Sequence, residues 1–167
     1  MTKLPELIDA YLYRLGQDGP EYLALLRASH KIYAGQWRMI GGKVDPGETF
    51  WQAAYREIVE ETQLYPSPFW TVPTVNQFYN PKHDVFHKIP VFAGEVELQT
   101  DPTLDDEHTD FQWVKAQDIS TYFLWPEQQR IVLAIDSILR QGTILPQWLI
   151  DPAEGQKGTP AEGVTKG

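Results

Sequence analysis

The sequence predicts an α/β fold, a mixed β-sheet sandwiched between α-helices, from two kinds of periodicity. β-Branched and aromatic residues mix with polar ones over residues 8–15 and 22–27, and apolar residues alternate over residues 87–98, which is typical of strands. Apolar residues recur at helical spacing over residues 50–62 and again after Pro126, which is typical of amphipathic helices. Strands and helices that alternate in this way along one chain favour an α/β architecture.

The first half of the chain is expected to form a hairpin, a loop and a helix. Residues 16–20 supply the Gly, Asp and Pro of a turn between the first two strands, and residues 28–36 form a loop. A second turn, over residues 45–49, leads into the first helix. Thr49 is expected to be the N-cap of that helix, and Gln52, three residues on, to complete a capping box.

The second half is expected to hold strands followed by a long helix. Prolines at positions 66, 68 and 73 end the first helix and predict an irregular or broken strand after it. Residues 101–109 form an acidic loop, and residues 111–114 form a short strand. The helix that opens at Pro126 has one apolar face, formed by Ile131, Ala134, Ile135, Ile138 and Leu139.

A length of 167 residues suits one domain, and 42% hydrophobic residues can form a sizeable core. We expect that domain to span residues 1–150. Residues 151–167 are rich in Gly, Pro, Lys and Glu with almost no apolar side chains, so we expect a disordered tail there.

The composition excludes several classes of function. The 14 Lys and Arg residues are outnumbered by 23 Asp and Glu residues, and the net charge of -9 opposes a broad grip on a nucleic acid polymer or on an anionic membrane. The absence of cysteine excludes disulfides, thiolate nucleophiles and cysteine-based zinc sites. No apolar run is long enough to span a bilayer, and the first ten residues lack the features of a signal peptide, so we expect a cytoplasmic location.

Three carboxylates on the first predicted helix indicate a cation site. Glu57, Glu60 and Glu61 stand at helical positions i, i+3 and i+4, so they share one face with neighbours about 5–6 Å apart. Like charges at this spacing repel one another unless a cation lies among them, and clustered oxygen ligands suit Mg²⁺ or Mn²⁺. Taken alone, such a cluster is more often a solvated acidic face.

The register between this helix and the preceding glycine loop resembles the Nudix box. Glu48 follows Gly42 after five residues, and Arg56 follows Glu48 after seven. The three glutamates come next, and the pattern closes at an aliphatic residue, Leu64.

This resemblance implies a Nudix hydrolase, with a mixed sheet between helices, that hydrolyses a nucleoside diphosphate linked to another group. It further implies that the three glutamates are catalytic and bind Mg²⁺ or Mn²⁺. Arg56 would brace them by ion pairing and Glu48 would support them or join the metal network. The backbone carbonyl of Gly42 would be a further metal ligand.

The sequence departs from the family pattern at Gln63, where the family usually has Gly. That glycine would end the helix in the left-handed conformation, which a residue with a side chain enters at a cost of about 1–2 kcal/mol. The end of the helix is therefore the part of the box that this sequence leaves in question.

A second resemblance concerns the segments 106–114 and 125–130, which are similar to the dihydroneopterin triphosphate pyrophosphatase branch of the family. This resemblance implies that Glu107 contributes to the metal site. The alternative is that Glu107 is one carboxylate of an acidic surface loop. His108 is expected to form hydrogen bonds or to pack, because the metal site is already rich in oxygen ligands.

Basic and aromatic residues are the candidates for holding the substrate. Arg27 lies where family members often present a basic residue near the phosphates, and Arg38 and Lys43 flank the glycine loop. Phe78 and Tyr79 could stack on a purine or pterin ring. Phe86 is a further stacking candidate, and Trp37 is expected to be a core residue.

The sequence therefore predicts a Mg²⁺-dependent pyrophosphohydrolase that cleaves a nucleoside or pterin triphosphate to the monophosphate and pyrophosphate. One alternative is a Nudix hydrolase of ADP-ribose or of a dinucleoside polyphosphate. Another is a non-catalytic nucleotide-binding module, which the full set of box carboxylates disfavours. The sequence leaves open which glutamate is the general base and whether the chain forms a homodimer.

Overall fold

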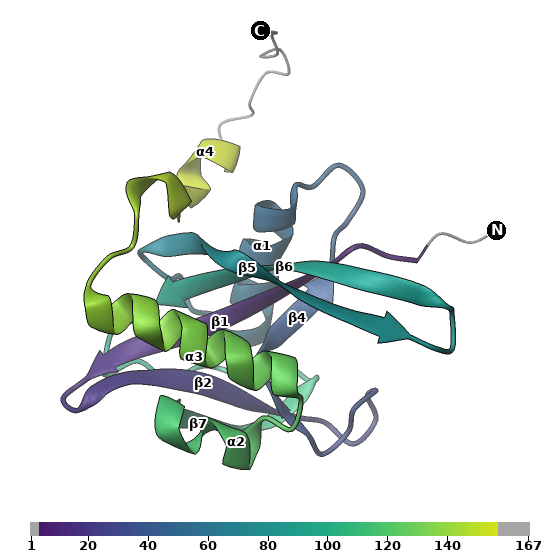
Figure 1. Ribbon diagram of the computed structural model, residues 1–167, viewed down its shortest axis with the longest axis horizontal. Helices are drawn as coiled ribbons and strands as arrows, with labels where there is room; N and C mark the ends of the chain where they lie inside the picture. Colours follow the sequence, from purple (N-terminus) through teal and green to yellow (C-terminus); the bar gives the residue numbers. More distant parts are fainter. Residues whose placement is uncertain (1–3, 157–167) are drawn as a thin grey trace, which may run out of the picture.

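The computed structural model describes residues 4–156, which form one mixed eight-stranded sheet with helices on both faces (Figure 1). The predicted α/β architecture, a mixed sheet between helices, is confirmed. The strands are β1 Leu7–Gly16, β2 Gly19–Arg27, β3 Trp37–Arg38, β4 Ile40–Lys43, β5 Phe69–Asn80, β6 Val85–Glu95, β7 His108–Lys115 and β8 Leu149–Ile150. The helices are α1 Phe50–Thr62, α2 Ile119–Tyr122, α3 Pro126–Gln141 and α4 Pro152–Gln156, with short 3₁₀ turns at Ala116–Asp118 and Pro146–Trp148.

The central strand β1 makes the sheet mixed. It pairs antiparallel with β2 and with β4, and parallel with β6. The path of the sheet runs β3-β2-β1-β6-β5-β8, with β4 added to β1 and β7 added to β2. The pairing with β4 sets Asp9 opposite Gly41 and Ile8 opposite Gly42, so the glycine loop is held directly against the centre of the sheet.

The core is divided between the two faces of β1. Ile8 and Leu12 point toward α1, where they pack with Ile58. Tyr11 and Tyr13 point the other way, into a cluster with the apolar face of α3. Since successive side chains of a strand point to opposite faces, one strand contributes to both layers. In Figure 1, α3 crosses the near face of the sheet and α1 lies behind it.

The region after α1 is more regular than the prolines predict. The expected irregular stretch forms the 12-residue strand β5, and only its pairing with β6 shifts register, between Thr71 and Val75. Pro73 lies within that shift, which fits the loss of a ladder hydrogen bond at proline. β6 ends at Glu95 and not at residue 98, because the Val96 N–H donates to the Tyr13 carbonyl and a turn follows.

The sequence predicts a disordered tail from residue 151, but the structure continues with a helix there. Residues 152–156 form α4, at whose start the Asp151 carboxylate accepts a hydrogen bond from the backbone N–H of Ala153 at 2.9 Å. The rest of the expected tail, residues 157–167, lies outside the described residues. Among the described residues, no helix combines the length and the apolar character needed to cross a membrane.

Candidate active site

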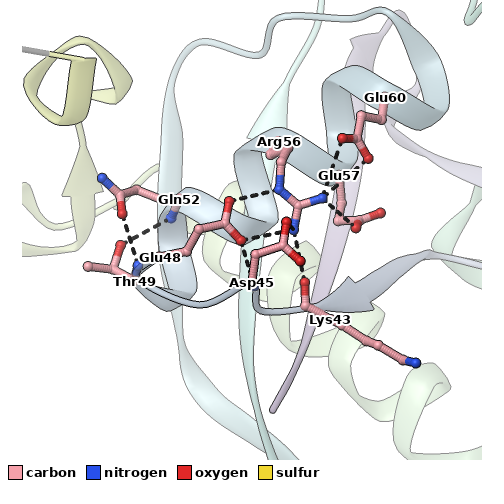
Figure 2. Close-up of polar contacts among 8 residues, drawn as sticks. All are labelled: Lys43, Asp45, Glu48, Thr49, Gln52, Arg56, Glu57 and Glu60. Atoms are coloured by element: carbon pink, nitrogen blue, oxygen red, sulfur yellow. Dashed lines mark hydrogen bonds and ion pairs between the residues drawn. The ribbon is translucent and has the colours of Figure 1, made fainter. Parts of the chain in front are cut away.

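The start of α1 is fixed by the capping box that the sequence predicts. The backbone N–H of Gln52 donates to Thr49 Oγ1 at 3.3 Å, and the Thr49 N–H donates to Gln52 Oε1 at 2.9 Å (Figure 2). Two backbone donors that the helix leaves free are thereby satisfied. This cap sets the register in which the acidic residues of α1 face the glycine loop.

The end of α1 takes the left-handed conformation without a glycine. Gln63 has φ 58° and ψ 26°, and its N–H donates to the Val59 carbonyl at 2.8 Å. The Thr62 hydroxyl donates to the Ile58 carbonyl at 2.6 Å and accepts from the Leu64 N–H at 3.1 Å. The departure from the family pattern therefore leaves the helix regular through Glu61.

Arg56 binds the carboxylates of the box into one network (Figure 2). Its guanidinium donates to both oxygens of Glu48, at 2.7 and 2.9 Å, in the bidentate geometry that favours strong pairing. It also donates to Glu57 Oε1 at 2.8 Å, to Glu60 Oε2 at 3.2 Å and to the Lys43 carbonyl at 2.9 Å. The hydrogen bond from Arg56 lowers the pKa of Glu48. The predicted bracing role of Arg56 agrees with these contacts.

Glu57 lies so close to the glycine loop that a side chain at position 42 would displace it. A Cβ at Gly42 would overlap the Glu57 carboxyl carbon and would lie 2.5 Å from its Cγ. A shift of the glutamate or of the loop would then be required. The glycine thus lets the backbone approach the carboxylates of α1.

Glu61 is buried and lacks a hydrogen-bond donor. It is 1% exposed, and within the described residues neither of its carboxyl oxygens accepts a hydrogen bond. Burial, reinforced by the neighbouring Glu57 and then by Glu107, raises the pKa of Glu61 well above its ordinary value. His108 is another close neighbour, and its Nε2 lies 3.6 Å from Glu61 Oε1.

His108 connects Glu61 to the acidic loop. Its Nδ1 lies 3.1 Å from Asp105 Oδ1, and burial lowers the pKa of the imidazole despite that partner. A neutral imidazole carries one N–H, so it can donate to Asp105 or to Glu61 but not to both. His108 therefore has the hydrogen-bonding position that the sequence predicts for it.

Two basic side chains form ion pairs with Glu107 and hold it beside Glu61 and His108. Its carboxylate lies 3.3 Å from Lys31 Nζ and 3.8 Å from Arg27 Nη1. Its carbonyl accepts the backbone N–H of Ala28 at 2.8 Å, which ties the acidic loop to the end of β2.

The carboxylate oxygens of this site are the type of ligand that a hard divalent cation prefers. The unpartnered oxygens of buried Glu61 and the repulsion from Glu57 and Glu107 create a place where positive charge would be stabilised. Among residues 4–156, however, no three Asp, Glu or His side chains already converge on one point as a metal cluster. Glu57 and Glu60 point toward Arg56 (Figure 2).

A cavity of about 390 Å³ adjoins this cluster. Its volume falls within the range of small-molecule sites, roughly 300–1,000 Å³. Six of the residues that the sequence nominates line it: Arg27, Arg38, Gly42, Lys43, Glu61 and Phe78. A wider hollow of about 840 Å³ lies between the end of α1 and the C-terminal segment, and none of the nominated residues lines it.

Comparison with known proteins identifies the fold family. The family model described as the NUDIX domain matches residues 8–135 of this chain. The chain belongs to the Nudix family. Members of this family are typically dependent on divalent metals and act on substrates of the nucleotide diphosphate type.

The similar curated proteins are nucleoside triphosphatases. NudI of Klebsiella pneumoniae strain 342 is 30% identical over 114 residues, which cover 64% of this chain and 81% of that protein. NudI of Klebsiella pneumoniae subsp. pneumoniae is 30% identical over 128 residues, 72% of this chain and 90% of that protein.

Solved structures share the Nudix fold at lower identity. A Caenorhabditis elegans Ap4A hydrolase binary complex matches with a TM-score of 0.69 and 22% identity, over 83% of this chain and 99% of that chain. The Escherichia coli dihydroneopterin triphosphate pyrophosphohydrolase matches with a TM-score of 0.67 and 18% identity, over 81% and 97%.

Several residues nominated from the Nudix resemblance lie outside the cavity. Glu57 and Glu60 are bound to Arg56, and Glu107 lies 3.8 Å from Arg27, but none of these residues except Arg27 lines the cavity. Tyr79 is not brought to the cavity. Its side chain is half-exposed, its hydroxyl donates to Asp84 at 2.9 Å, and its ring faces that of Phe86, which is exposed.

The opposite positions of Phe78 and Tyr79 follow from strand geometry, because neighbouring residues of β5 point to opposite faces. Phe78 stacks on His87 with ring centroids 4.9 Å apart, at the wall of the cavity. Trp37 packs partly buried against the core, edge-on to Tyr122 at 5.4 Å, which agrees with the core position predicted for it.

Among the buried polar residues of the cavity wall, sequence reasoning missed three: Asp9, Asn76 and Gln128. All three are buried. A signal exists for two of them. Asp9 is a charge within an apolar strand, and Gln128 occupies the apolar face of α3, one turn before Ile131.

Proposed function

We propose that this Nudix protein is a divalent-metal-dependent pyrophosphohydrolase that cleaves a nucleoside or pterin triphosphate to the monophosphate and pyrophosphate. The observation that carries the proposal is the buried, unpartnered carboxylate of Glu61, which lines the cavity beside the Arg56-bound glutamates. Similarity to nucleoside triphosphatases supports the choice of a triphosphate.

In this proposal Glu57, Glu60 and Glu61 hold Mg²⁺ or Mn²⁺, together with the carbonyl of Gly42, and Glu107 completes the set. The bound ion would lower the pKa of a water molecule and neutralise charge on the phosphates. All the proposed donors are oxygens, as Mg²⁺ prefers.

The side chains of this chain have their own tasks in the reaction. Arg56 fixes the rotamers of Glu48 and Glu57, so that the carboxylates are positioned before substrate enters. Arg27 and Lys43 line the cavity and supply positive charge to the phosphates. A glutamate in reach of the attacking water takes its proton.

The proposal is tested by removing charge while keeping shape. Glu57→Gln and Glu61→Gln should each lower turnover by about 10²–10⁴-fold, the range typical of lost acid–base or metal-site groups. The measurement is pyrophosphate release with Mg²⁺ or Mn²⁺, with circular dichroism to verify the fold. Glu97→Gln is the matched control, because Glu97 is exposed in a turn away from the cavity, and it should leave turnover unchanged. Wild-type turnover in either site variant would refute the assignment.

The substrate is tested by a panel in which released fragments are identified. It contains nucleoside triphosphates, dihydroneopterin triphosphate, ADP-ribose and dinucleoside polyphosphates. Release of pyrophosphate from a triphosphate supports the proposal. Preferred cleavage of ADP-ribose or of a dinucleoside polyphosphate would replace it, and nucleotide binding without any product would indicate a non-catalytic module.

A further inference from the structure

One part of the wall of the 390 Å³ cavity, the polar wall, is formed by polar side chains that are buried. Asp9 of β1, Asn76 of β5 and Gln128 of α3 line it and are 4%, 6% and 1% exposed. Arg38 of β3 joins them, partly buried. Three strands and a helix thus deliver polar groups to one small space, where an apolar wall would be the usual composition.

Several polar atoms of this wall have no partner. Within the described residues, Asn76 Oδ1, Gln128 Oε1 and Arg38 Nε are buried without a hydrogen bond. Each such atom costs about 1–3 kcal/mol when left unpaired. Buried polar groups in folded proteins are usually paired, so three unpaired atoms at one cavity call for an explanation.

The orientation of the Asn76 amide is fixed by its neighbour. Asn76 Nδ2 donates to Asp9 Oδ2 at 2.7 Å, which leaves the amide oxygen as the free acceptor. A carboxylate accepts about four hydrogen bonds, so Asp9 keeps capacity for a ligand. The wall therefore offers three acceptor groups, on Asp9, Asn76 and Gln128, and one donor, Arg38 Nε.

Flat aromatic faces border the same space. The Arg38 guanidinium lies 4.3 Å from the centre of the Tyr33 ring and 5.7 Å from that of Trp125. Trp125 contacts Phe78 edge-on at 6.0 Å, and its Nε1 donates to Gln36 Oε1 at 3.0 Å, which holds the indole in place. Planar side chains around a cavity suit a planar ring.

We infer that this wall recognises the ring edge shared by guanine and pterin, in which an amino group and a ring N–H lie beside a carbonyl. The inference rests on the proposed function and narrows its substrate class. The amino group and the N–H would donate to the Asp9, Asn76 and Gln128 acceptors, and Arg38 Nε would donate to the carbonyl. Adenine and cytosine offer an amino group but set a bare ring nitrogen beside it, which would face an acceptor.

The same cavity is lined by residues that the proposed function assigns to the phosphates and the metal ion. Arg27, Lys43 and Glu61 line it together with the polar wall, so a ring bound at that wall would extend its phosphates toward the carboxylates. A site built on buried hydrogen-bonding groups rejects an analogue that leaves those groups unpaired. The amino group should therefore dominate selection.

The test uses ligand pairs that differ only in that amino group and contain no bond for the enzyme to hydrolyse. Calorimetry on the metal-free protein compares guanosine 5′-monophosphate with inosine 5′-monophosphate, and pterin with pteridin-4-one, which lacks only the 2-amino group. At least one amino-bearing ligand should bind about tenfold tighter than its partner, since a good bidentate contact discriminates by roughly that factor or more. The pair with the larger ratio identifies the guanine or the pterin as the source. Equal affinities within both pairs would mean that solvent satisfies the wall, and would overturn the inference.

Variants locate the selectivity in named residues. Asp9→Asn and Gln128→Leu should each reduce the ratio toward one, whereas Asp18→Asn, in the exposed turn between β1 and β2, should preserve it. Gln128→Leu decides the matter if Asp9→Asn fails to fold, because it replaces an unpartnered amide by an apolar group of similar size. A ratio unchanged in Gln128→Leu and in folded Asp9→Asn overturns the inference. Selective binding without pyrophosphate release from any triphosphate would contradict the proposed function and leave this inference standing.

Discussion

Glu61 shows how one residue can be unfavourable for folding and favourable for binding. Its neighbour Glu57 receives a hydrogen bond from Arg56, but the described residues provide no such donor to Glu61. A buried carboxyl in that situation has a raised pKa, so ionising it at neutral pH opposes folding. In the proposed function, a bound divalent cation would supply the partner that Glu61 lacks.

Replacing Glu61 should therefore stabilise the metal-free protein. Glu61→Gln removes the charge and should raise the free energy of unfolding at pH 7 by about 1–3 kcal/mol. For a chain of this size, each kcal/mol corresponds to a rise in Tm of about 2–4 °C. Adding Mg²⁺ should raise the Tm of the wild type and leave that of the variant nearly unchanged. A variant that melts below the metal-free wild type would contradict this account of Glu61.

Asp9 should make stability depend on pH. Burial raises its pKa from 3.8 to about 6, against the opposing effects of the Asn76 hydrogen bond and the Arg38 charge. The folded state therefore binds the proton more tightly than the unfolded chain. The stability that this group contributes is complete below pH 3.8 and is lost as the pH rises through about 6.

Asp9→Asn abolishes that titration. Between pH 4 and pH 7, the free energy of unfolding of the wild type should fall relative to that of the variant by about 2–3 kcal/mol. Urea unfolding at several pH values measures this difference, and Asp18→Asn should follow the wild type. Parallel curves for wild type and Asp9→Asn would show that Asp9 is not in the buried, protonatable state.

Among the elements, α1 is the one whose start the sequence predicts best. Its N-cap and capping box depend on residues three positions apart, so local sequence is sufficient to locate them. β8 and α2, of two and four residues, carry too little pattern to be predicted, and they form because they pack on larger elements. Pro73 interrupts β5 less than its effect on strand hydrogen bonding predicts, because pairing with β6 continues on both sides of it.

The end of α1 leads to a prediction for Gln63. This residue occupies the left-handed region, so Gln63→Gly should remove strain and raise the free energy of unfolding by about 0.5–1 kcal/mol, after subtraction of the backbone entropy of glycine. Thermal or urea unfolding provides the measurement. Gln141→Gly, at the last residue of α3, has no such strain to relieve and should be destabilising by about 0.5–1 kcal/mol. A loss of stability in Gln63→Gly would be inconsistent with the observed cap.

In the whole molecule, the site divides into a part that sequence predicts and a part that it does not. The box residues lie within 23 positions of one another, from Gly42 to Leu64, so their register can be recognised without a structure. The polar wall depends on β1, β3, β5 and α3, and only folding brings these elements together. Asp9 and Gln128 interrupt apolar patterns, which indicates a special position but not the space that they share.

Glu107 tests whether the acidic loop belongs to the site. It lies on a loop that contacts the end of β2 through Arg27 and Lys31, far from α1 in sequence. Glu107→Ala should weaken Mn²⁺ binding by about tenfold, the lower end of the effect of supporting groups at metal sites. The adjacent exposed residue Asp106 provides the control, and Asp106→Ala should have no effect. If Glu107→Ala retains both wild-type Mn²⁺ affinity and wild-type turnover, Glu107 is only a surface-loop carboxylate.

The separate origins of the two ends of the cavity have a consequence for how such a protein diversifies. The hydrolytic end comes from one short stretch of chain, held against β1 through the pairing of Ile8 with Gly42. The polar wall, which we propose binds the ring, is formed by single residues of β1, β3, β5 and α3. Single substitutions could therefore change the substrate specificity while the residues proposed for hydrolysis stay the same. Protein designers could use the same separation by replacing residues of the polar wall and leaving the glycine loop and α1 unaltered.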